Sequence, residues 1–135
     1  MTVRLLLDSH VFMWLAQDEG RLLLPARDAI ASAAEIFLST VSIAELCIKS
    51  GLGKLILPGP VAADPAAGFR QLAQAMGVTI LPLDVEPAAA LNDLPHHHRD
   101  PFDRLLVAQA MVAGLTLVTH DRQLRHYAGL DIVWT

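Results

Sequence analysis

Short apolar runs alternate with helical stretches along this chain. The runs at residues 3–7, 35–39, 78–81 and 115–118 are typical of buried strands, and residues 132–134 are expected to form a short edge strand. Strands that alternate with helices pair in parallel through right-handed crossovers. The pattern therefore predicts an α/β fold, a three-layer sandwich with a mainly parallel central sheet.

The expected helices are marked mainly by their ends. Two Asp-Pro pairs, at residues 64–65 and 100–101, each place a good N-cap before a proline of the first helical turn. Gly51, Gly77 and Gly114 stand where helices are expected to stop. The expected helices span residues 11–16, 25–34, 42–50, 65–76, 86–94, 101–113 and 121–127, and residues 51–65 are the least regular stretch.

The length of 135 residues fits a single domain, residues 1–135, that buries its own core. No apolar run reaches the roughly 18 residues that a membrane helix needs, and the acid at position 8 comes too early for a signal peptide. The single Cys47 excludes an internal disulfide and is expected to pack as a small apolar side chain. A cytoplasmic protein is therefore expected. Because 53% of the residues are hydrophobic, we also expect an apolar subunit or partner interface.

Four acidic residues fall where the expected strands give way to loops or helices. Asp8 ends the first apolar run, Glu45 comes shortly after the second, and Asp121 follows the fourth. Asp103 lies in the first turn of the helix expected at 101–113. In an open parallel sheet, sites lie outside the carboxyl ends of the strands, and crowded carboxylates repel one another unless a hard divalent cation neutralises them. The pattern predicts a Mg²⁺- or Mn²⁺-dependent phosphodiesterase.

Each acid also has a structural interpretation. Asp8 and Asp121 can cap the helices that follow them. Thr40 or Ser42 can cap the next helix, and Ser42 with Glu45 has the spacing of a capping box.

The two acids of the third block differ in their expected roles. Asp100 precedes Pro101 and is the better cap, so we assign the metal role to Asp103.

The net charge of −4 argues weakly against nucleic-acid binding, but the basic residues are not evenly spread. Six of the ten lie close in sequence to Glu45, Asp103 or Asp121: Lys49, Lys54, Arg99, Arg104, Arg122 and Arg125. A cationic rim around an acidic centre suits a polyanion, although each of these residues can also be an ordinary solvated helix residue.

The triplet His96-His97-His98 lacks the Cys pair or the His-Glu-x-x-His helix of zinc sites. It is expected to form a solvated loop near the substrate, where some of these histidines could contact phosphate or act as acid–base helpers.

Four sequence blocks carry a resemblance to a known family. They are LLLDSH at 5–10, SIAE at 42–45 with KSGLGKL at 49–55, HHRDPFDRLLVAQA at 97–110, and LVTHD at 117–121; the third is the most specific. With these blocks the chain resembles PIN domains, and specifically the VapC-type ribonuclease toxins of bacterial toxin–antitoxin pairs.

The resemblance implies a Rossmann-like PIN fold, Mg²⁺ or Mn²⁺ dependence and endonucleolytic cleavage of RNA. It also implies a homodimer and a small VapB-type antitoxin whose C-terminal segment lies in the active-site groove. Carried over by motif, the metal-binding acids are Asp8, Glu45, Asp103 and Asp121. Ser9 and Thr119 match small polar positions beside the site.

The resulting hypothesis is metal-assisted hydrolysis of RNA phosphodiester bonds. The four acids hold one or two ions, and Arg99, Arg104 and Arg122 neutralise flanking phosphates. Two alternatives stay open: a non-catalytic α/β module whose acidic pocket binds a basic peptide, and a PIN-type nuclease that cuts DNA.

Overall fold

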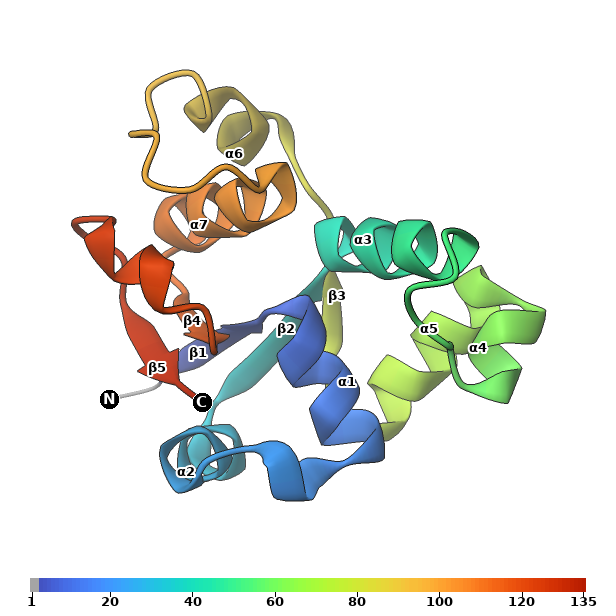
Figure 1. The fold of residues 1–135 in the computed structure, drawn as a ribbon. Helices are drawn as coiled ribbons and strands as arrows, with labels where there is room; N and C mark the ends of the chain where they lie inside the picture. The colour runs from blue at the N-terminus through green and yellow to red at the C-terminus, as the bar shows by residue number, and fades with distance from the viewer. Residues whose placement is uncertain (1–2) are drawn as a thin grey trace.

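The computed structural model describes residues 3–135 and contains one five-stranded sheet in the order β3-β2-β1-β4-β5 (Figure 1). All four neighbouring strand pairs are parallel. The strands are β1 (Arg4–Leu7), β2 (Glu35–Ser39), β3 (Thr79–Leu81), β4 (Thr116–Thr119) and β5 (Ile132–Trp134). The predicted α/β fold with a parallel central sheet is confirmed.

Helices cover both faces of this sheet. The α-helices are α1 (Ser9–Gln17), α2 (Leu24–Ser32), α3 (Thr40–Gly51), α4 (Gly59–Ala63), α5 (Pro65–Ala75), α6 (Val85–Ala90) and α7 (Pro101–Ala113), and the 3-10 helices are η1 (Glu19–Arg21) and η2 (Arg122–His126). In Figure 1, α6 and α7 lie on one side of the strands, and α1 and α2 lie on the other. The arrangement is a three-layer sandwich.

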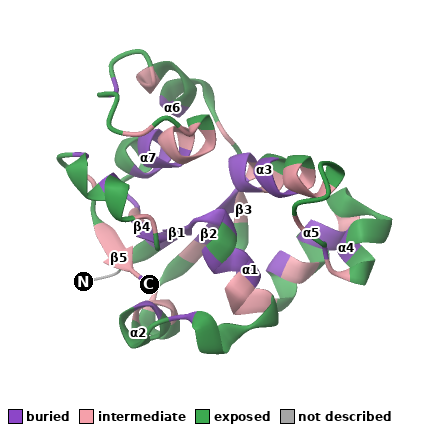
Figure 2. Ribbon diagram, in the orientation of Figure 1, coloured by how far each residue is buried: buried purple, intermediate pink, exposed green. Residues whose placement is uncertain are grey.

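The alternation of side chains along β1 divides the core into two clusters. Leu5 and Leu7 pack with residues of α1, α2 and α5, whereas Leu6 packs with residues of α7 and η2. All three leucines are fully buried, and each such side chain contributes roughly 1.5–3 kcal/mol of hydrophobic stabilisation. Figure 2 shows the buried residues gathered along the central strands and on the helix faces that cover them. The central strand is therefore anchored on both faces, which fixes the position of the residue that follows it, Asp8.

Among the described residues, no helix is long and apolar enough to cross a membrane.

Several boundaries differ from the prediction for identifiable reasons. Helix α1 begins at Ser9 rather than at residue 11, because the Asp8 carboxylate caps it. Residues 51–65 are not uniformly irregular: Pro60 lies in the first turn of the short helix α4. Helix α6 ends at Ala90 rather than at residue 94, and the last helical segment is a 3-10 helix.

The caps were only partly predicted. Asp64 and Asp100 cap α5 and α7 as expected. The expectation that Thr40 or Ser42 caps α3 is wrong. The cap is Ser39, whose Oγ accepts a hydrogen bond from the Val41 N–H at 3.0 Å.

Candidate active site

Asp8 leaves the end of β1 and is held by hydrogen bonds on both oxygens. The Val11 N–H donates to Oδ1 at 2.9 Å, and the Thr119 hydroxyl, at the end of the neighbouring strand β4, donates to Oδ2 at 2.6 Å. His120 Nδ1 lies 3.7 Å from the same Oδ2. Burial alone would raise the pKa of Asp8, but these three groups outweigh it and lower the pKa below its ordinary value. Capping α1 and facing the site are therefore two roles of one carboxylate.

Glu45 reaches the same region from the second turn of α3. Its side chain is buried; Oε1 accepts a hydrogen bond from the Ser9 hydroxyl at 2.6 Å, and Oε2 forms a salt bridge with Lys49 Nζ at 2.6 Å. Burial opposes the charge of Lys49, but the contact with Glu45 raises the pKa of the ammonium group overall. The capping-box role of Glu45 is wrong, because both oxygens point to these partners rather than back to the start of the helix.

Asp103 and Asp121 meet around an imidazole. His98 Nε2 lies 2.5 Å from Asp121 Oδ2 and 3.4 Å from Asp103 Oδ2. His98 Nδ1 accepts the Asp100 N–H at 2.9 Å, so Nε2 carries the hydrogen and donates it to Asp121. One ligand atom from each of His98, Asp103 and Asp121 lies within 4.8 Å of the other two, a spacing that could hold a metal ion.

Thr119 connects Asp8 with Asp121. Its hydroxyl donates to Asp8 and accepts the Asp121 N–H at 3.1 Å. The pairing of β1 with β4 places the two acids that follow these strands at one edge of the sheet. All four predicted acids thus gather at the carboxyl edge of the central strands.

The crowding of negative charge has a clear effect on the pKa of Asp103. Burial, then the nearby carboxylates Asp100, Glu45 and Asp8, raise the pKa of Asp103 to about 7, with only partial relief from His98. A raised carboxyl pKa is the expected result of crowding several acids together. Carboxylate oxygens are also the ligands that hard divalent cations prefer. The residues present therefore fit Mg²⁺ or Mn²⁺.

The sequence matches the PIN-domain family model over residues 5–130. This chain belongs to the PIN-domain family. It is 36% identical over 124 residues to "Ribonuclease VapC22" of Mycobacterium tuberculosis (strain ATCC 25618 / H37Rv), and the match covers 90% of each protein.

Solved structures share the fold of this PIN domain. VapBC2 from Rickettsia felis bound to a promoter DNA fragment has a TM-score of 0.72 at 14% identity, covering 98% of this chain and 99% of that chain. VapBC-5 from Mycobacterium tuberculosis has a TM-score of 0.62 at 19% identity, with coverages of 98% and 99%.

The residues predicted to bind substrate have different surroundings in this PIN domain. Ser9 and Thr119 are buried, and their hydroxyls donate to the carboxylates described above. Arg104 is half-buried and donates to the Leu94 carbonyl at 3.0 Å, so it holds the preceding loop.

The other two predicted cations are exposed. Arg122 lies over the Trp134 ring, 4.5 Å from its centroid. Arg99 lines a hollow of about 300 Å³ with the histidine triplet and Gln123. Their contact with a substrate stays a prediction.

Three residues of this PIN domain lie against the site acids without having been predicted to do so: Lys49, His98 and His120. Lys49 was placed only in a general cationic rim, although it follows Glu45 by four residues, the helical spacing of a salt bridge. His98 was expected to lie on a solvated loop, and its half-buried bridge between Asp121 and Asp103 has no sequence pattern. His120 is flanked by two site residues, which was its only signal.

Proposed function

We propose that this PIN domain is a metal-dependent endoribonuclease and the toxin of a type II toxin–antitoxin system. The observation that carries the proposal is the gathering of Asp8, Glu45, Asp103 and Asp121 at one sheet edge, where the pKa of Asp103 is raised to about 7. The name of the curated relative supports ribonuclease as the activity.

The four acids would hold one or two Mg²⁺ or Mn²⁺ ions. Such an ion supplies Lewis acidity to the scissile phosphate and a nucleophile at neutral pH. The protein holds the acids in place: Thr119 fixes Asp8, and Ser9 together with Lys49 fixes Glu45.

His98 carries its hydrogen on Nε2, toward Asp103 and Asp121. It stabilises these two acids in the ion-free state and is in place to donate that hydrogen within the site. Arg99, which lines a hollow together with His98, and Arg122, which follows Asp121 in sequence, are exposed and bind phosphates that flank the scissile bond.

The proposed partners follow from relatives. The similarity to solved VapBC structures supports a VapB-type antitoxin for this chain. We also expect a homodimer, which the resemblance to VapC-type toxins implies. The whole sequence, residues 1–135, then acts as one PIN domain in the cytoplasm.

The deciding experiment replaces one acid without removing its cap. Asn retains N-capping ability, so Asp8→Asn should fold and yet lose Mg²⁺- and Mn²⁺-dependent cleavage of single-stranded RNA, together with growth inhibition. Asp64→Asn is the matched control, because the Asp64 carboxylate caps α5 by the same type of contact, to the N–H three residues on, and has no role in the site. Retained cleavage by Asp8→Asn refutes the assignment.

The same assay separates the two alternatives. A non-catalytic binder of basic peptides gives no product at any Mn²⁺ concentration, and a DNA nuclease cuts a DNA strand of the same sequence in preference to the RNA.

A further inference from the structure

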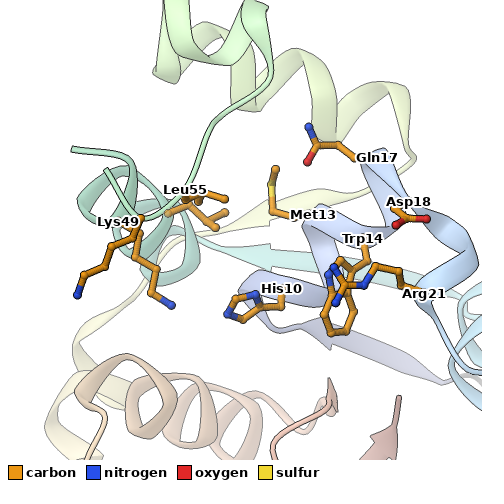
Figure 3. A pocket seen from close by; sticks show the side chains of 10 residues that line it. His10, Met13, Trp14, Gln17, Asp18, Arg21, Lys49 and Leu55 are labelled. Carbon is orange, nitrogen blue, oxygen red and sulfur yellow. The ribbon is translucent and has the colours of Figure 1, made fainter. Parts of the chain in front are cut away.

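A cleft of about 370 Å³ opens beside the acids, between α1 and the C-terminal half of α3. Its apolar lining comes from Met13, Leu46 and Leu55, and its rim carries the rings of His10 and Trp14 (Figure 3). The volume is in the range of clefts that hold small molecules. None of the roles given above to the acids uses this space.

The rings at this cleft form a cluster that ends at the candidate active site. The His10 and Trp14 centroids lie 5.3 and 5.2 Å from that of His120, and 6.0 Å from each other. His120 in turn lies 3.7 Å from Asp8. A planar ligand on these rings would therefore lie beside the acids rather than at a separate site.

The indole of Trp14 is held in place by a neighbouring side chain. The Arg21 guanidinium lies over Trp14, 4.7 Å from its centroid, and restricts the indole. The His10 ring lies 6.0 Å from the indole and is tilted by 42° to it. His10 and Trp14 therefore offer π-faces suited to stacking by an aromatic group.

The lysines that line the cleft favour a bound anion on their side of it. In Figure 3, Lys49 and Leu55 lie on one side, and Asp18 and Arg21 on the opposite side. Lys54 lines the cleft as well, and among residues 3–135 it forms no salt bridge, whereas Lys49 is paired with Glu45. A ligand with an aromatic base and a phosphate fits this division better than a purely apolar one.

We propose that this cleft is a nucleotide subsite of the nuclease, in which a base of single-stranded RNA next to the scissile phosphate stacks on Trp14 and His10 while Lys54 binds its phosphate. The proposal rests on the proposed function and names how its substrate is held. Gln17 and Asp18 supply hydrogen-bonding groups for the base edge. Stacking on aromatic side chains is a common mode of single-strand recognition.

Fluorescence can report this contact directly, because the chain has only two tryptophans. In an Asp8→Asn, Trp134→Phe protein, Trp14 is the sole indole and RNA is not cleaved. Titration with a short single-stranded oligoribonucleotide should change its emission saturably. Adding Trp14→Ala should raise the Kd, measured by fluorescence polarisation of a labelled RNA, about 10-fold, the loss of one base–aromatic stack.

The cations provide a second measurement that does not depend on the indole. The logarithm of the RNA association constant falls linearly with the logarithm of the salt concentration. Lys54→Ala should make this negative slope shallower by about 0.7, the value for one phosphate contact on a single strand. Arg70→Ala is the control, because Arg70 is an exposed cation on α5 that lines a different hollow. Melting curves of all variants establish that they fold.

The outcomes separate this proposal from the nuclease assignment. RNA that does not bind, or that binds with unchanged Trp14 emission and an unchanged Kd in Trp14→Ala, overturns the subsite; such a result would fit a cleft that takes a segment of a protein partner. If the unsubstituted protein still cleaves RNA, the proposed function survives. If RNA engages Trp14 but no metal-dependent cleavage occurs, the subsite stands and the nuclease assignment fails.

Discussion

Asp103 carries an electrostatic cost in the ion-free protein. Its pKa rises from 3.8 to about 7 on folding, so the folded state binds more protons than the unfolded state between these pH values. The free energy of unfolding therefore falls as pH rises through this window, and the full cost is present above it.

Replacing Asp103 with Asn should remove this cost. We expect Asp103→Asn to be more stable than the unsubstituted protein above pH 7 in EDTA, by on the order of 2 kcal/mol, and the difference to vanish near pH 4. Urea unfolding across this pH range measures it. Parallel pH profiles for the two proteins would mean that Asp103 does not titrate abnormally.

Whereas Asp103→Asn should stabilise the protein, breaking the salt bridge between Glu45 and Lys49 should destabilise it. Glu45 is buried and Lys49 is its only salt-bridge partner among residues 3–135, so Lys49→Met leaves a buried carboxylate uncompensated. Because Lys49 is one-third exposed, we expect a loss of about 1–2 kcal/mol rather than the larger cost of a fully buried pair. In a double-mutant cycle, Glu45→Gln should recover part of the loss, whereas strict additivity would exclude coupling.

The sequence predicted the acids better than their neighbours. Asp8 directly follows β1 and Asp121 comes two residues after the end of β4, so local pattern and sheet topology together locate them. His98 reaches Asp121 from an irregular loop, and a loop has no periodicity from which to predict the direction of a side chain.

Among the secondary-structure elements, the local sequence predicted the strands but not helix α4. Strands β1, β2 and β4 are short apolar runs whose burial follows from composition, and they were predicted to within a residue or two. Helix α4 contains glycine and proline, which indicated a loop. Its position depends on contact with α5, a tertiary effect that local propensity does not contain.

That contact requires a glycine. A Cβ atom on Gly68 would lie 2.5 Å from Val61 Cα and 2.9 Å from the Pro60 carbonyl oxygen, so α4 and α5 pack backbone to backbone. Although Ala favours helix by about 1 kcal/mol, Gly68→Ala should destabilise the protein by roughly 1–3 kcal/mol through overpacking. Gly51→Ala, at a helical glycine with nothing within 4 Å, is the control and should be neutral or stabilising. Equal thermal midpoints for the two variants would contradict the close packing.

For the whole molecule, the acids couple ion binding to folding. The two sides of the sheet are held by separate cores, but the site draws on β1, β4, α3 and α7 together, so an ion bound there stabilises the assembled layers rather than one element. A ligand that binds only the folded state adds about 2.7 kcal/mol when present at 100 times its Kd.

We therefore expect Mg²⁺ or Mn²⁺ to raise the melting temperature of the unsubstituted protein at pH 8 and to have little effect on Asp103→Asn. Because protons compete with the ion for Asp103, whose pKa is about 7, the ion-dependent shift should shrink steadily as pH falls to 6 and below. Differential scanning calorimetry with and without EDTA measures both effects. A shift of equal size at pH 8 and pH 5.5, or one retained in Asp103→Asn, would locate the stabilising ion away from these carboxylates.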